Sequence, residues 1–343
     1  MAGIVLYNPE IGRLKENVAA IAPQVERLVF IDNASKNMKD VEEVLPANAI
    51  VIHNDKNLGI ATALNEILQY ALDNDYDWAL TLDQDTIAAG NMIEAYSKVA
   101  ASNQHLGVIC CRFRDRHYVT EDESYTSDRY VYSCITSASM VNVKAWQEVG
   151  GFDDSMFIDS VDHDFCHTLW RSGWGVYKTI ETEILQEIGS SSHGVKIFGR
   201  WFKVHGHSTF RYYYRSRNKV YEVRKSHNNL RGLFNALENF FLMYLVWRYE
   251  QHKFAKTAKI IKGSWDGLTC PITKPTPRVK NKLNNLNRGG YKWTSKPLTV
   301  GMLAILNEER RVAPSTTSCT SSARWKHPIT CSATRTTYGC PRK

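Results

Sequence analysis

The chain has 343 residues, and its 43 Lys and Arg against 35 Asp and Glu give a formal net charge of +8. That total conceals two halves of opposite sign: residues 1–190 carry 14 basic and 29 acidic side chains, whereas residues 191–343 carry 29 basic and 6 acidic ones. With 43% hydrophobic residues the chain can build a core, which excludes wholesale disorder. The longest apolar run, Phe240–Trp247, is far shorter than the roughly 20 residues of a membrane span.

The N-terminus and the cysteines predict a cytoplasmic protein. The first residues lack the basic stretch and the long apolar run of a secretory signal. The eight cysteines are irregularly spaced and form no CxxC pair, and the adjacent Cys110 and Cys111 suit neither a zinc knuckle nor a disulfide. We therefore expect most of the cysteines to be reduced and structural.

In the acidic half, short apolar runs alternate with amphipathic segments. Strands are expected at residues 3–7, 28–31, 49–52, 78–82 and 106–111, and helices at 59–72, 92–101 and 159–172. Strands that alternate with helices are typical of βαβ units. The predicted fold class is α/β, with a mostly parallel mixed sheet flanked by helices.

Polar side chains follow several of these strands at their carboxyl ends, where α/β sheets bind ligands. They are Asn8, Asp32, Asn33, Asn54, Asp55, Asp83 and Asp85. Capping of the next helix explains any one of them. It explains Asp83-Gln84-Asp85 poorly, because neighbouring carboxylates repel each other. Two carboxylates at a strand end can instead hold Mg²⁺ or Mn²⁺ together with a diphosphate.

A second acidic motif lies at residues 150–174, which begin GGFDD and continue FIDSVDHDFC. Acidic side chains such as Asp162 and Asp164 are favoured at a helix N-terminus by the helix dipole, which gives them a purely structural explanation. The functional explanation is a carboxylate base that takes the proton of an acceptor hydroxyl.

Together the segments YNP, DNAS, NLGIATALN, LDQD, GGFDD, FIDSVDHDFC and RYYYRSRN resemble the family 2 glycosyltransferases of the GT-A fold. Among these they are most similar to bacterial rhamnosyltransferases that use dTDP-rhamnose. The resemblance extends from about residue 3 to residue 225 and keeps the order of the family's motifs. It implies an inverting enzyme of cell-surface polysaccharide synthesis.

The resemblance also implies a role for each matching residue. The nucleotide-sugar pocket would be formed by Tyr7, Asn8, Asp32, Asn33, Asn57, Gly59 and Asp83. The metal ligands would be Asp83 and Asp85, and Asp162 would be the catalytic base. The chain departs from the family at Gln186, which stands where many members have a metal-binding His, and this departure leaves the metal dependence open.

The basic half contains two further candidate surfaces. Arg211 and Arg217 lie almost two helical turns apart and could bind the donor diphosphate or a lipid phosphate; a solvated basic face is the structural alternative. The apolar segment Leu233–Trp247, followed by lysines, suits an anionic membrane surface, the catalytic domain or a partner in a homodimer.

The expected organisation is a catalytic domain over residues 1–195, a basic helical region over 196–290 and a disordered, possibly non-native tail over 291–343. The expected function is rhamnosyl transfer to a lipid-linked or saccharide acceptor at the inner face of the cell membrane. A sugar-nucleotide nucleotidyltransferase is one alternative, but residues 1–20 lack its Gly-rich phosphate loop. A nucleic-acid-binding protein is another, but no recognition motif supports it.

Overall fold

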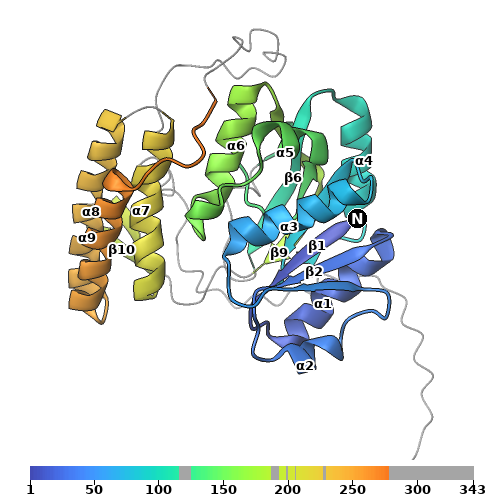
Figure 1. Cartoon of the computed structure of the whole chain (residues 1–343), viewed down its shortest axis with the longest axis horizontal. Coiled ribbons are helices and arrows are strands. Elements are labelled where there is room, and N and C mark those ends of the chain that lie inside the picture. Colours follow the sequence, from blue (N-terminus) through green and yellow to red (C-terminus); the bar gives the residue numbers. More distant parts are fainter. Residues whose placement is uncertain (116–124, 187–192, 198–199, 205, 227–228, 278–343) are drawn as a thin grey trace, which may run out of the picture.

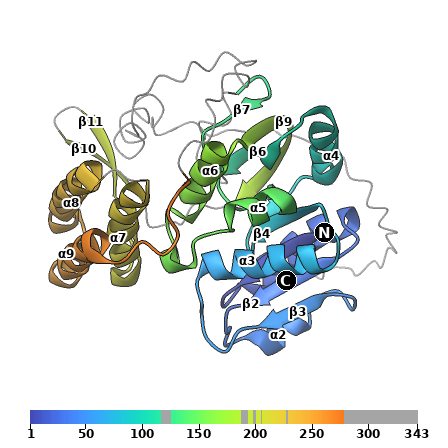
Figure 2. The same ribbon diagram turned by 45° about the horizontal axis from the view of Figure 1, so that its top comes forward.

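The computed structural model describes residues 1–115, 125–186, 193–197, 200–204, 206–226 and 229–277. The predicted tail at 291–343 lies outside these residues. A nine-stranded mixed sheet with helices on both faces forms the larger part of the molecule, and three long helices stand together at one side of it, beyond α6 (Figures 1 and 2). This architecture confirms the predicted α/β fold class.

The central sheet has the strand order β3-β2-β1-β4-β8-β6-β9-β5, and β7 pairs with β9. Its strands are β1 (Ala2–Leu6), β2 (Leu28–Asp32), β3 (Ile50–His53), β4 (Trp78–Asp83), β5 (Ile87–Ala88), β6 (Leu106–Asp115), β7 (Arg129–Tyr130), β8 (Ser139–Asn142) and β9 (Gly175–Gln186). The first four strands run parallel to one another, as β6 does to β9, whereas β5, β7 and β8 are antiparallel to their neighbours. The carboxyl ends of β1, β2 and β4 therefore lie side by side.

Two hydrophobic cores lie on the two faces of this sheet. One core joins the sheet to α1 (Ile11–Ile21), α2 (Met38–Glu42) and α4 (Met92–Ser102). The other joins it to α3 (Ile60–Asp73), α5 (Val143–Val149) and α6 (Val161–Ser172). In each long helix the buried residues recur at helical spacing, as they do at Leu64, Ile67, Leu68 and Ala71 of α3.

The structure differs from the sequence prediction at two places near the acidic motifs. The sequence also predicts strand material at 130–143, but the chain there forms the short strands β7 and β8 with a turn before β8, in which Ser139 N donates to Thr136 O (3.3 Å). This turn is bound from β4. Thr81 Oγ1 donates to Thr136 O at 2.6 Å. The helix expected to begin at Asp159 begins at Val161, because Asp159 and Ser160 both have positive φ angles (65° and 62°).

The C-terminal helices are α7 (Thr209–Lys225), α8 (Asn229–Tyr249) and α9 (Lys253–Thr269), and the hairpin of β10 (His193–Ile197) and β11 (Arg200–Val204) packs on α8. The backbones of α7 and α9 approach closely. A Cβ atom at Gly263 would lie 2.3 Å from Tyr213 O, and one at Gly267 would lie 2.5 Å from Arg217 O. Glycine at these two positions therefore permits the crossing.

A buried ion triad fixes the end of α7 to α6 and to the segment that precedes it. Lys225 Nζ lies 2.8 Å from Asp153 Oδ2 and 2.6 Å from Asp164 Oδ2, and all three side chains are at most 3% exposed. The pKa of Asp153 is lowered, because Lys225 and Ser155 donate to it and outweigh its burial. Burial instead raises the pKa of Asp164 to about 6, despite Lys225, and its Oδ1 has no hydrogen-bond partner among the described residues.

Removal of the ammonium should be strongly destabilising. Lys225→Met would leave two buried carboxylates facing each other, and we expect the free energy of unfolding in urea to fall by about 3–5 kcal/mol. The matched control is Lys219→Met, which removes a more exposed ion pair with Glu238 (2.7 Å) and should cost at most about 1 kcal/mol. Equal losses in the two variants would contradict a special role for the triad.

Candidate functional site

The polar side chains predicted to meet at the carboxyl end of the sheet do so. In the parallel register Val5 lies beside Asp83 and Leu6 beside Asp32, so the segments that follow β1, β2 and β4 are neighbours. Tyr7 N donates to Gln84 Oε1 at 2.8 Å, which ties the segment after β1 to the acidic turn after β4.

The acidic pair Asp83 and Asp85 meets a third group at the end of β9. Gln186 Nε2 lies 3.0 Å from Asp83 Oδ2 and 3.5 Å from Asp85 Oδ1. The backbone of Asp83 is held on both sides, because its N–H donates to Ser137 Oγ (3.1 Å) and its carbonyl accepts from Asn17 Nδ2 (2.6 Å). The carboxylates are therefore presented by a rigid turn.

The electrostatics of this turn favour a cation. Burial, together with the charges of Asp85 and Asp162, raises the pKa of Asp83 to about 6, although the hydrogen bond from Gln186 acts in the opposite direction. Asp162 lines a small hollow together with Thr81 of β4, so the predicted base lies near the strand that carries the predicted metal ligands. Three carboxylates that repel one another form a region of negative potential.

The residues present fit a divalent cation whose coordination is completed by its ligand. In the described part of the chain, no group of three or more His, Cys, Asp or Glu side chains could hold a metal by itself. Asp83 and Asp85 would supply carboxylate oxygen atoms to the cation. The Gln186 side chain could rotate so that its amide oxygen, in place of its nitrogen, faces the same cation. Mg²⁺ and Mn²⁺ accept such oxygen ligands and usually keep positions for water and phosphate.

The predicted nucleotide-binding residues after β1 and β2 form a connected group. Asp32 is buried and accepts from Ser35 N (2.8 Å), and its other oxygen lies 3.2 Å from His53 Nδ1. Asn8 N donates to Ser35 Oγ at 2.9 Å. Tyr7, in contrast, is 48% exposed beside them, so its ring is available to a ligand.

Asn33, Asn57 and Gly59 shape the start of α3. Asn57 Oδ1 accepts from Gly59 N (2.9 Å), and Asn33 Nδ2 donates to Gly59 O (3.3 Å). Gly59 has φ +88°, and a Cβ atom there would lie 2.6 Å from Phe157 O. This segment, predicted to bind the donor, therefore touches the loop that precedes α6.

The two acids of the second motif point to different places. Asp164 is committed to Lys225 in the buried triad. Asp162, the second residue of α6, accepts from its neighbour His163 N (2.9 Å) and lines a small hollow with Thr81 and Cys134. Of these two acids, Asp162 is therefore the one able to act as a base.

The structure places the predicted phosphate-binding arginines at the same loop. Arg211 forms an ion pair with Asp159 (3.2 Å) and remains 46% exposed. Arg217 Nη1 donates to Ser155 O (2.7 Å) and to Asn218 Oδ1 (2.8 Å). Binding of a phosphate by either residue remains a prediction, and Arg217 already donates to one backbone carbonyl and one side-chain oxygen.

Sequence reasoning missed several residues that build the site. Gln186 was expected only as a weak metal ligand, yet its amide bridges the acidic pair. Lys225 and Asn218 lie in the basic helix α7, and both are buried. The RYYYRSRN motif could have drawn attention to Asn218, but no local pattern distinguishes Lys225 from the other cations of α7.

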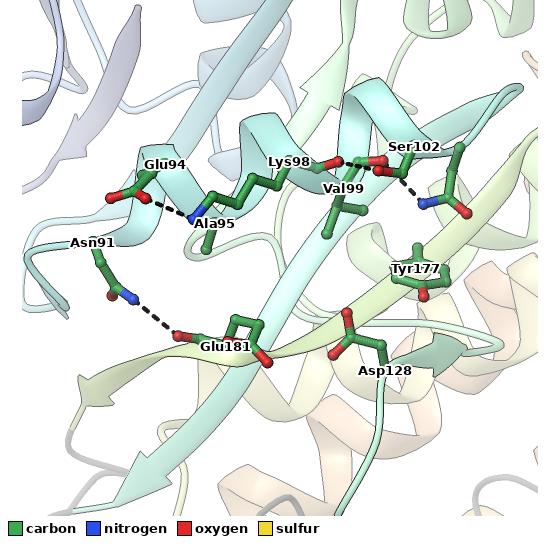
Figure 3. Close-up of a pocket in the computed structure, with 10 residues that line it drawn as sticks. Asn91, Glu94, Ala95, Lys98, Val99, Ser102, Asp128, Tyr177 and Glu181 are labelled. Atoms are coloured by element: carbon green, nitrogen blue, oxygen red, sulfur yellow. Dashed lines mark hydrogen bonds and ion pairs between the residues drawn. The ribbon is translucent and has the colours of Figure 1, made fainter.

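A separate hollow of about 280 Å³ lies between α4 and β9 (Figure 3). Its polar groups are largely satisfied within the chain: Glu94 pairs with Lys98 at 2.6 Å, and Asp128 accepts from Thr179 Oγ1 at 3.1 Å and from Ile180 N at 2.8 Å. No predicted site residue lines it. We therefore place the candidate site at the strand ends and not in this hollow.

Comparison with known proteins identifies the family of the N-terminal part of the chain. Residues 2–169, which span the acidic pair and the start of α6, match the model of glycosyl transferase family 2. The chain contains a family 2 glycosyltransferase domain. This glycosyltransferase is 28% identical over 293 residues to the dTDP-rhamnosyl transferase RfbF of Shigella flexneri, which covers 78% of this chain and 94% of that protein. The nucleotidyltransferase and nucleic-acid-binding alternatives are thereby set aside.

Solved structures share the glycosyltransferase's fold. A fragment of S. aureus TarS in complex with UDP-GlcNAc superposes with a TM-score of 0.53 at 13% identity, over 78% of this chain and 80% of that one. GalNAc-T7 with UDP, GalNAc and Mn²⁺ gives a TM-score of 0.52 at 12% identity. The match covers 80% of this chain but only 58% of the GalNAc-T7 chain.

Proposed function

We propose that this glycosyltransferase moves rhamnose from dTDP-rhamnose to a hydroxyl group of a saccharide acceptor, with inversion at the anomeric carbon. The observation that carries the proposal is that the four acids of the site have different surroundings. Asp83 and Asp85 form a pair at the end of β4, Asp162 lies close enough to raise the pKa of Asp83, and Asp164 is held by Lys225. The similarity to a dTDP-rhamnosyl transferase supports the choice of donor.

The donor would lie across the ends of β1, β2 and β4. Tyr7, Asn8, Asp32 and Asn33 would contact the nucleoside, and Asn57 and Gly59 would line the pocket at the start of α3. Asp83, Asp85 and Gln186 would hold Mg²⁺ or Mn²⁺, which neutralises the charge that develops on the departing diphosphate. Mn²⁺ accompanies UDP in the GalNAc-T7 structure, which shares this fold.

Asp162 would act at the acceptor. Its carboxylate takes the hydroxyl proton while the acceptor oxygen bonds to the anomeric carbon, and the bond from that carbon to the diphosphate breaks on the opposite face. A second carboxylate is not needed in this single displacement. The commitment of Asp164 to Lys225 fits this mechanism.

The isosteric variant Asp162→Asn tests the proposal. It removes the proton acceptor and keeps the shape of the side chain, so release of dTDP from dTDP-rhamnose should fall by about 10²–10⁴-fold. The dissociation constant of dTDP, measured by calorimetry, should change by less than about threefold, because Asp162 does not bind the nucleotide in this scheme. Unchanged turnover would refute the assignment of the base.

Donor controls accompany that measurement. The wild-type enzyme should release nucleotide faster from dTDP-rhamnose than from UDP- or GDP-sugars, and EDTA should suppress the release until Mg²⁺ or Mn²⁺ is restored. Full activity in EDTA would show that the enzyme needs no divalent metal and that Gln186 is not a metal ligand.

The acceptor and the location can be proposed from the C-terminal helices. We infer a lipid-linked saccharide acceptor at the inner face of the cell membrane, which α8 and α9 would contact peripherally. No described helix is long and apolar enough to cross a bilayer. However, α8 exposes one apolar stripe along its length and α9 another. These stripes consist of Leu233, Leu237, Phe240, Tyr244, Trp247, Phe254, Ile261 and Trp265, each at least 44% exposed.

The two stripes form one surface of suitable charge. They meet where the rings of Trp247 and Phe254 pack edge to face at 5.0 Å, and each stripe lies opposite the buried face of its helix. Residues 209–269 contain twelve Lys and Arg against four Asp and Glu. An apolar, aromatic surface on a basic element matches an anionic bilayer better than a second, equally basic copy of the chain.

Vesicle sedimentation tests this location. Wild-type protein should bind vesicles that contain anionic lipid and bind purely zwitterionic vesicles more weakly, and Phe240→Ser with Trp265→Ser should reduce the partition coefficient at least about tenfold. Phe210→Ser is the matched control, since Phe210 is 50% exposed but packs on Phe157 outside the stripes. A stable dimer that the double variant dissociates, without vesicle binding, would contradict the proposal.

A further inference from the structure

An unfavourable backbone conformation precedes α6, the helix that carries Asp162. Phe157 has φ 60° and ψ −61°, and Ile158 N donates to Met156 O at 2.7 Å, which is a γ-turn of the rarer, strained hand. Asp159 and Ser160 follow with φ 65° and 62°. Residues other than glycine avoid these angles, so the surrounding structure must hold the chain in this shape.

One buried amide accounts for most of that restraint. Asn218 Nδ2 lies 2.7 Å from Met156 O, 2.8 Å from Ile158 O and 2.9 Å from Asp159 O. The side chain is completely buried. Its two N–H groups are thus directed at three carbonyls of the turn, and Arg217, which donates to Asn218 Oδ1, fixes the orientation of the amide.

The remaining carbonyls of the turn are held from two sides. Arg217 Nη1 donates to Ser155 O at 2.7 Å, so α7 also grips the start of the turn. Ile60 N, at the start of α3, donates to Phe157 O at 2.7 Å, and the Phe157 ring stacks on Tyr214 with centroids 4.9 Å apart. The turn therefore connects α7 with the segment proposed to bind the donor.

The turn also decides where α6 begins. Ser160, the residue before α6, makes no side-chain capping bond, so the helix start is set by the backbone that leads into it. Asp162 follows two residues later. A change in the turn would displace the carboxylate of Asp162 without altering the acidic pair after β4.

We propose that Asn218 is a positioning residue for Asp162, which it places by holding residues 156–160 in their strained conformation. The inference rests on the proposed function, in which Asp162 is the catalytic base. It gives a role to the RYYYRSRN motif, whose Asn218 and Arg217 both bind the turn.

Comparing two nucleophiles distinguishes a displaced base from general damage to the active site. Water must lose a proton to Asp162 as its oxygen bonds to the anomeric carbon and dTDP departs. Azide, an anion, forms a carbon–nitrogen bond and displaces dTDP without losing a proton, so it needs no base. The measurement is dTDP release from dTDP-rhamnose in water alone and with added azide.

Asn218→Ala and the isosteric Asn218→Asp should behave like Asp162→Asn. Release to water should fall at least about 50-fold, within the usual contribution of a general base, while azide-dependent release stays within about threefold of wild type. Asn239→Ala is the matched control, because Asn239 is a buried amide that bonds to Ser216 O and Ser264 Oγ, away from the turn. It should preserve both reactions.

The outcomes are distinguishable. Asn218 variants that keep the water reaction, or that lose both reactions in parallel, overturn the proposal. If Asp162→Asn keeps the water reaction, the base assignment fails and the proposal fails with it. If Asn218→Ala does not fold, the isosteric Asn218→Asp decides, and it must show the same selective loss of the water reaction.

Amide hydrogen exchange tests the restraint independently of the donor. Peptides that span residues 156–164 should exchange at least about tenfold faster in Asn218→Ala than in wild type, with no such change in Asn239→Ala. Equal exchange in the two variants overturns the proposal. If the wild-type enzyme releases no dTDP with either nucleophile, the donor assignment fails, and the exchange result still decides whether Asn218 holds the turn.

Discussion

Repulsion between carboxylates is the constraint on which the site depends. Asp83 and Asp85 lie at the end of β4, and burial together with the charges of Asp85 and Asp162 raises the pKa of Asp83. A second acidic pair, Asp153 and Asp164, lies behind them and is held by Lys225 from α7. The basic C-terminal part thus supplies the cation for Asp153 and Asp164, and the proposed function assigns Asp83, Asp85 and Asp162 to a metal, a diphosphate and a proton.

The charge split along the sequence therefore has a structural meaning. The acidic half carries the strand-end carboxylates, and the basic half contributes α7, whose Lys225, Arg217 and Asn218 all bind segments around α6. The rest of the basic half is different in kind, since α8 and α9 combine lysines with exposed aromatic side chains. The cations of α7 therefore bind the segments around α6, whereas α8 and α9 present lysines together with aromatic side chains at the surface.

The sequence was sufficient for the sheet, its ligand-binding edge and the choice of candidate acids, because strand periodicity and the ends of parallel strands are local signals. It was insufficient for the start of α6, where Asp159 and Ser160 fit a helical pattern but adopt positive φ angles imposed by contacts with α7. Local pattern alone could not separate Asp162 from Asp164, since both lie in the first turn of one helix, and only the family resemblance selected Asp162. Their roles diverge only through Lys225, 61 residues away along the chain.

The anomeric configuration of the first product tests the central claim most directly. Transfer from dTDP-rhamnose to a saccharide acceptor, followed by proton NMR before the product can equilibrate, reports whether the new linkage has the configuration of the donor. A single displacement assisted by Asp162 predicts the opposite configuration. A product that retains the configuration of the donor would require a second displacement and would contradict the account.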